Sequence, residues 1–181
     1  MRVSENRILA WCTFAFCVLL SVLLSGGMAM RDMRLEARQV FYEGVAKNGA
    51  GIDRDLDERA ENARMLAENV ARFVGESPEL IALREACDVL LAADEIELRH
   101  AAYLQLESAV DACYAQVEAL LLSDDERRKV GYVYREICAQ SDMIRRDPYN
   151  MLARDFNESI AKFPAYLIAG MTGIDKLQFF E

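Results

Sequence analysis

The chain has 181 residues, which is enough for one membrane helix and one compact domain. Its formal net charge is −9. Leaving out Arg2, Arg7 and Glu5, the residues beyond position 30 carry 19 basic and 29 acidic side chains, a net charge of −10. Such a surface is a poor match for nucleic acid or for broad contact with anionic lipid, so we expect no nucleic-acid partner.

The first predicted element is a transmembrane helix over residues 8–30, preceded by a short tail, residues 1–7. The 23 positions from Ile8 to Met30 carry no charged side chain and are rich in Leu, Val, Phe and Ala. This length spans a lipid bilayer. The alternative is a cleaved signal peptide, with Gly27 and Ala29 as small residues before the cut. The length of the apolar run favours a retained anchor, with the bilayer as a partner.

The basic residues on the two sides of this segment are nearly balanced, so they do not fix its orientation. Five cysteines are present, without a CxxC pair, and an odd number argues against a disulfide framework or a zinc site. Free thiols favour a reducing compartment. We therefore expect a single-pass protein of the cell membrane whose remaining residues, 31–181, face the cytosol.

Residues 31–181 are predicted to form amphipathic helices joined by short turns, packed as an antiparallel bundle. The membrane helix continues past Arg31, and the glycines at residues 47–51 form a turn. Ser77 caps one helix, and Ser123 and Glu126 form a capping box at the start of another. The Asp147–Pro148 pair restarts or kinks a helix. The expected helices cover about residues 53–74, 78–91, 94–122, 124–146 and 149–163.

The C-terminal segment carries the most informative pattern. Apolar side chains recur at steps of 4, 3, 4 and 3, which predicts a buried helical seam. Pro164 should stop this helix near Phe163. Asn150 and Asn157 lie beside the seam, one heptad apart. The residues of the seam are Tyr149, Ala153, Phe156, Ile160 and Phe163.

This segment resembles the end of LemA family proteins, whose pattern reads roughly YN-x2-V-x2-YN-x2-I-x2-FP-x2-L-x-A, then Gly and a closing aromatic pair. Phe156 replaces the second tyrosine and Ala153 replaces the valine. The residues at matching positions are Tyr149, Asn150, Asn157, Ile160, Phe163, Pro164, Leu167, Ala169, Gly173 and Phe179.

A shorter upstream tract, ID-x2-L-x2-R, also resembles the family, with Arg64 where the family has a proline. It consists of Ile52, Asp53, Leu56 and Arg59. LemA proteins are membrane-anchored, helical and without an established biochemical activity. The resemblance implies an all-α fold, an N-terminal transmembrane helix followed by a bundle with an apolar tail. Its structural signature here is Phe156, Ile160, Phe163, Pro164 and Gly173.

No residue pattern indicates catalysis, a cofactor or a metal. The single histidine, His100, has no histidine partner, and we expect it to be an exposed helix residue. The acids at positions 53, 55 and 57 imitate the start of a calcium loop, but Glu58 stands where that loop needs glycine. We interpret them as favourable acids at a helix N-terminus. The chain is therefore not expected to be an enzyme.

The candidate binding residues are Tyr149, Asn150 and Asn157. The two amides either form hydrogen bonds between helices or recognise a peptide or ligand at the edge of the bundle. The tail from Leu167 to Phe180 either covers one end of the bundle or docks on a partner or membrane. The favoured function is a membrane-anchored interaction or scaffold protein with an unidentified protein partner. The alternative is a small-ligand or peptide receptor, or an enzyme, with a pocket at the bundle edge.

Overall fold

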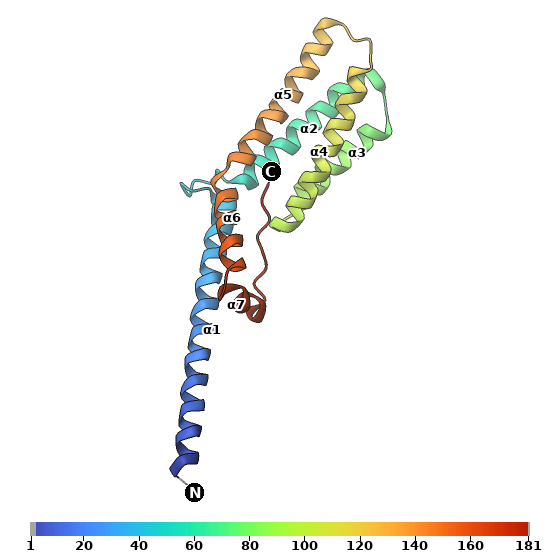
Figure 1. Cartoon of the computed structure of the whole chain (residues 1–181). Coiled ribbons are helices and arrows are strands. Elements are labelled where there is room, and N and C mark those ends of the chain that lie inside the picture. The colour runs from blue at the N-terminus through green and yellow to red at the C-terminus, as the bar shows by residue number, and fades with distance from the viewer. Residues whose placement is uncertain (1–2, 181) are drawn as a thin grey trace. The chain divides into compact units, whose positions relative to one another are not determined.

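The computed structural model describes residues 3–180, with side chains from Arg7 onward (Figure 1). The described residues contain helices and no strands, which confirms the predicted all-α class. The helices are α1 Val3–Glu43, α2 Ile52–Val74, α3 Pro78–Ala92, α4 Ile96–Glu118, α5 Asp124–Arg146, α6 Pro148–Ala161 and α7 Ala165–Thr172.

Local sequence signals explain several helix ends. The Ser77 hydroxyl accepts a hydrogen bond from the backbone N–H of Leu80 at the start of α3. Ser123 and Glu126 form the predicted capping box at the start of α5. The turn after α1 needs glycine, because a Cβ on Gly51 would collide with the carbonyl oxygen of Phe41.

The contacts of the chain divide it into two compact units, each assembled from segments distant in sequence. The first unit contains the chain up to Arg38 together with Leu152–Leu177. The second unit contains Gln39–Met151 together with the end of the chain from Gln178. The sequence suggests a boundary near residue 31, whereas these contacts place the divisions after Arg38, inside α6 and after Leu177.

The second unit is built around α2. This helix packs against α3, α4 and α5, and α3 also packs against α4. Consecutive helices from α2 to α5 run antiparallel (Figure 1). A stripe of fully buried apolar side chains on α2 explains this central place. The stripe consists of Ile52, Leu56, Ala60, Ala63, Leu66, Ala67 and Val70.

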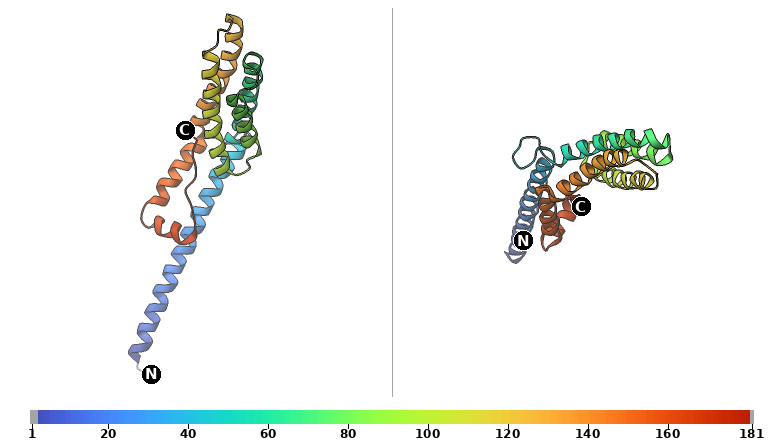
Figure 2. Two further views of the ribbon diagram at one scale, coloured as in Figure 1. Left: turned by 90° about the vertical axis from the view of Figure 1, so that its right-hand side faces the viewer. Right: turned by 90° about the horizontal axis from the view of Figure 1, so that it is seen from above.

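In the first unit, α7 packs against α1, and Figure 2 shows the N-terminal part of α1 extending beyond α7. The contact falls on two glycines of α1. A Cβ built on Gly26 would lie 2.8 Å from Cδ1 of Ile168, and one built on Gly27 would lie 3.1 Å from Cγ2 of Thr172. The absence of side chains at these two positions therefore lets the two helices approach closely.

α1 is long and apolar enough to cross a membrane, a property that it shares with signal sequences near an N-terminus. Large apolar side chains near the N-terminal end of α1 are exposed: Ile8 is 65%, Trp11 71% and Phe14 61% exposed. The predicted continuation of this helix past Arg31 is confirmed, because α1 ends at Glu43.

The predicted seam is confirmed at Tyr149, Ala153, Phe156 and Ile160, which are all buried. The expectation for its last residue is wrong, because Phe163 is 77% exposed. α6 ends at Ala161. The helical spacing that directs Ile160 inward therefore no longer sets the direction of Phe163.

Candidate functional site

Asn150, a predicted binding residue, is buried and holds the end of the chain. Its side-chain Nδ2 donates to the carbonyl oxygens of Ile144 at 2.7 Å and Phe180 at 2.9 Å. Its Oδ1 accepts from the backbone N–H of Phe180 at 2.7 Å. The amide of Asn150 therefore pairs with both backbone polar groups of Phe180, as a neighbouring β-strand would.

Asn157 pairs with Leu177 in the same manner. Its Nδ2 donates to the carbonyl oxygen of Leu177, and its Oδ1 accepts from the N–H of Leu177, both at 2.8 Å. Seven helical residues rise by about 10.5 Å, and three extended residues span about 10 Å. The heptad spacing of the two asparagines thus suits tail residues three positions apart.

Tyr149 and Phe180 belong to an aromatic cluster in the second unit. The Tyr149 hydroxyl donates to the carbonyl oxygen of Gln178 at 2.6 Å. The ring of Phe180, fully buried, lies with its centroid 5.6 Å from Phe41 and 5.7 Å from Tyr103. The three predicted binding residues thus form hydrogen bonds with the tail, and this geometry supports their structural interpretation.

His100 is half-buried rather than exposed, because its ring packs edge-on against Phe180 at a centroid distance of 5.3 Å. Burial lowers the pKa of this imidazole. Within residues 3–180, no group of three or more His, Cys, Asp or Glu side chains is arranged to hold a metal ion.

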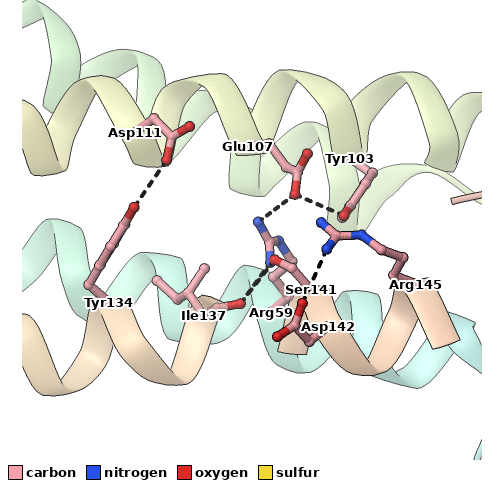
Figure 3. A network of polar contacts seen from close by, with 9 residues as sticks. All are labelled: Arg59, Tyr103, Glu107, Asp111, Tyr134, Ile137, Ser141, Asp142 and Arg145. Carbon is pink, nitrogen blue, oxygen red and sulfur yellow. Dashed lines mark hydrogen bonds and ion pairs between the residues drawn. The ribbon is translucent and has the colours of Figure 1, made fainter. Parts of the chain in front are cut away.

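Polar side chains gather instead in a hollow between α4 and α5 (Figure 3), which we call the α4–α5 hollow. Its volume is about 250 Å3. α2 contributes Arg59, and the helical spacing of α4 and α5 directs several side chains of each toward the hollow. The lining residues are Arg59, Glu107, Val110, Asp111, Tyr134, Ile137, Cys138, Ser141, Asp142 and Arg145.

Arg59 is the most deeply buried charge of the hollow, with 3% of its side chain exposed. Its Nη1 donates to the carbonyl oxygen of Ile137 at 2.8 Å and to the hydroxyl of Ser141. Its Nη2 lies 3.2 Å from Oε1 of Glu107. The guanidinium also lies over the ring of Tyr103, 5.2 Å from its centroid. These contacts join α2, α4 and α5 through one side chain.

Glu107 connects Arg59 to Tyr103. Its carboxylate accepts a 2.8 Å hydrogen bond from the Tyr103 hydroxyl as well as the contact from Arg59. Burial, together with this hydrogen bond, raises the pKa of Tyr103 to about 12. Tyr103 therefore remains a neutral donor at physiological pH, and it is not a candidate general base.

The outer part of the hollow is acidic. Asp142 pairs with Arg145 at 3.2 Å, and Asp111 accepts a 3.3 Å hydrogen bond from the Tyr134 hydroxyl. The Tyr134 ring is stacked on Tyr114 at a centroid distance of 3.7 Å. Three carboxylates thus face two guanidinium groups, and Asp111 has no ion-pair partner among the described residues.

The residues of the α4–α5 hollow do not form a recognisable pattern in the sequence. One signal was present: Arg59 occupies a position of the α2 stripe where helical spacing predicts an apolar residue. Arg59 is also the last residue of the ID-x2-L-x2-R tract. Asp53 of that tract pairs with Arg99 at 2.9 Å, and Arg99 also pairs with Asp57 at 2.9 Å. The charged residues of the tract therefore bind α2 to neighbouring helices.

No protein-family model, curated protein or solved structure matches the chain. The resemblance to the LemA family rests on the residue patterns described above. The structure gives these patterns a physical role, because Asn150 and Asn157 hold the tail and Arg59 joins three helices.

Proposed function

We propose that the chain is a membrane-anchored helical interaction protein. α1 crosses the bilayer once, and the acidic unit of α2–α5 binds a protein partner. The observation that carries this proposal is the uncharged stretch from Ile8 to Met30, most of whose large apolar side chains are exposed. Water is an unfavourable environment for such a surface, whereas hydrocarbon is a favourable one.

The contact with α7 supports a retained anchor over a cleaved signal peptide. Ile168 and Thr172 lie against Gly26 and Gly27 of α1. Cleavage near Ala29 would remove both glycines and expose the buried side of α7. The resemblance to LemA proteins supports the same interpretation, and we propose a cytosolic location for the acidic unit. The proposal assigns no catalytic role.

Site-specific photo-crosslinking in cells tests the interaction. A photo-reactive residue replaces Asp111, which is exposed in the α4–α5 hollow, or Glu85, which is exposed on α3. The proposal predicts a discrete crosslinked protein from position 111 and not from position 85. Identical products from both positions, or none from position 111, would contradict a specific partner at the hollow.

The hollow also favours a second candidate function, a receptor for a small ligand or peptide with a cationic group. Asp111 faces the hollow without an ion-pair partner among the described residues, and the chain beyond residue 30 has a net charge of −10. Convergent polar groups in a concave site are typical of ligand binding. A lysine or arginine side chain would complement Asp111.

Thermal melts of the full-length protein in detergent test this candidate. Short peptides containing lysine should raise the melting temperature of the wild-type protein, because a ligand that binds the folded state stabilises it. The Asp111→Asn variant should lose this shift. A matched glutamate peptide is the control. An equal shift with that peptide, or with Asp111→Asn, would contradict the candidate.

A further inference from the structure

We propose that α7 and the turn before it, residues 163–172, lie in the interface of the bilayer that α1 crosses. This inference rests on the proposed transmembrane anchor. The chain would then contact the membrane through two elements, one that spans it and one that lies in its surface.

α7 lies near the C-terminal end of the uncharged stretch of α1. α7 contacts Gly26 and Gly27, which belong to the uncharged stretch of α1. Residues 8–27 extend over about 30 Å at the helical rise per residue. The hydrocarbon core of a bilayer is also about 30 Å thick. If the core begins near Ile8, the contact with α7 therefore lies at its opposite boundary.

One side of α7 is apolar and uncovered. Ile168 and Ala169 are buried, whereas the apolar side chains on the other side of the helix are exposed. These are Tyr166 at 50%, Leu167 at 45% and Met171 at 70%, with Phe163 at 77% in the preceding turn. The helical spacing of Tyr166, Leu167 and Met171 places these three side chains on one face of α7. Exposed apolar patches of this kind mark contacts with partners or membranes.

The distribution of charged residues around α7 also favours the bilayer interface. The chain carries no charged residue between Lys162 and Asp175, which flank the segment on its two sides. Aromatic side chains such as Tyr166 are enriched at the level of the lipid headgroups. The turn between α6 and α7 has backbone polar groups outside a regular helix, which are not tolerated when exposed to the hydrocarbon core. These features together place the segment at the interface.

The surface that α1 presents to lipid extends along the helix to the level of its contact with α7. Leu24 and Met28 of α1 flank the glycine contact and are 60% and 62% exposed. α1 and α7 belong to the same compact unit, so a bilayer that covers Leu24 and Met28 also reaches the level of α7. The bilayer is therefore the occupant that the structure favours for the exposed face of α7.

Tryptophan fluorescence in reconstituted vesicles tests the inference. Trp11 is the single tryptophan of the chain and lies in the proposed anchor, so the wild-type protein reports the anchor alone. A Trp11→Phe/Tyr166→Trp variant reports α7. A Trp11→Phe/Tyr132→Trp variant is the matched control, because Tyr132 is 59% exposed on α5 and undergoes the same substitution.

Each protein is reconstituted in vesicles of phosphatidylcholine whose acyl chains carry bromine atoms. The bromine atoms lie either near the headgroup (shallow) or near the terminal methyl group (deep). The variant with tryptophan at position 166 should lose most of its emission with the shallow bromines and less with the deep ones. Its emission should be insensitive to iodide in the water. The control with tryptophan at position 132 should respond to iodide and not to bromine.

The outcomes separate this inference from the anchor. If bromine quenches Trp11 while position 166 behaves like position 132, the anchor stands and the placement of α7 is overturned. α7 then presents its apolar face to water or to a protein. If bromine leaves Trp11 unquenched, the anchor itself is wrong, and the inference falls with it.

Discussion

Two neighbouring helices, α4 and α5, supply partners for the buried guanidinium of Arg59. The backbone oxygen of Ile137, the Ser141 hydroxyl and the Glu107 carboxylate all bind it. The two members of the ion pair differ in exposure, since 3% of the Arg59 side chain and 31% of the Glu107 side chain is exposed. The pair is therefore asymmetric, because water can hydrate Glu107 but not Arg59.

This asymmetry predicts that removing Glu107 and removing Arg59 lower the free energy of unfolding by different amounts. Glu107→Gln leaves a buried cation without its counter-charge and should lower the free energy of unfolding by about 2–3 kcal/mol, somewhat below the usual range for a broken buried pair. Arg59→Met leaves a carboxylate that water can reach and fills the space with an apolar chain, so it should cost less. Urea titration of the full-length protein in detergent measures both.

Asp142→Asn is the control for this comparison, because the Asp142 side chain is 59% exposed and its pair with Arg145 is a surface pair. Its removal should change stability by less than about 1 kcal/mol. A larger loss in Arg59→Met than in Glu107→Gln would show that the hydrogen bonds of the guanidinium to Ile137 and Ser141 matter more than its counter-charge, contrary to our interpretation.

The thiols predict a pattern of chemical reactivity. Cys87 and Cys113 are buried, and burial raises the pKa of each thiol to about 11. Since the thiolate is the reactive form, both should resist alkylation by iodoacetamide in the native protein at pH 8. Cys138 is exposed and should react first. Mass spectrometry of the labelled peptides measures the three rates, and rapid labelling of Cys87 in the folded protein would contradict its burial.

The same thiols predict that the stability of the fold decreases at alkaline pH. The pKa of both is raised on folding, so their protonated forms persist in the folded state while the unfolded chain ionises near pH 9. Their contribution to stability is therefore fully present below pH 9 and decreases as the pH rises toward 11. A Cys87→Ala/Cys113→Ala variant should lose part of this dependence in urea titrations at pH 8 and pH 10.

At the level of elements, the tail depends on the two asparagines of α6. Asn150 and Asn157 each satisfy both backbone polar groups of one tail residue. Without the side chain, these backbone groups lose their partners, and buried groups without partners are costly. Asn150 is 5% exposed, so the loss should be larger at this position.

We therefore expect Asn150→Ala and Asn157→Ala each to lower the free energy of unfolding by about 1–3 kcal/mol. Glu158→Ala is the matched control on α6, where the side chain is 62% exposed and its contact with Lys162 is a surface pair. Urea titration compares the three variants. If Asn157→Ala has the stability of the wild-type protein but loses a crosslinked partner, the residue serves binding rather than the fold.

Phe180 provides a second test of the tail. Phe180→Ala removes a fully buried ring from a cluster of aromatic side chains and should cost roughly 3–5 kcal/mol. Phe163→Ala is the matched control, because Phe163 is 77% exposed, and its effect on the same urea titration should be small. Equal effects of the two substitutions would contradict the docking of the tail.

Local patterns in the sequence predicted most elements well. Ser77 and Ser123 set the starts of α3 and α5 through caps that involve only neighbouring residues. Helical spacing likewise predicted the burial of Phe156 and Ile160. It failed at Phe163, because spacing carries no information beyond the end of the helix. The tail residues that Asn150 and Asn157 bind lie 30 and 20 residues away, so no local pattern could identify them.

On the scale of the whole molecule, contacts between distant segments decide the organisation. Both compact units combine segments that are not consecutive in the sequence, separated by 113 residues in the first unit and by 26 in the second, and periodicity along the chain does not encode such pairing. The α4–α5 hollow is equally non-local, because α2, α4 and α5 each contribute lining residues. The sequence could indicate Arg59 as an unusual residue, but it could not show which side chains surround it.

The central claim is that the chain is held in a membrane by an intact α1. Cell membranes are washed with alkaline carbonate, and the mass of the protein in the pellet and in the wash is determined by mass spectrometry. The account predicts that the protein stays in the pellet with residues 1–30 attached. Release of the full-length chain into the wash, or a mature chain that begins near Met30, would contradict it.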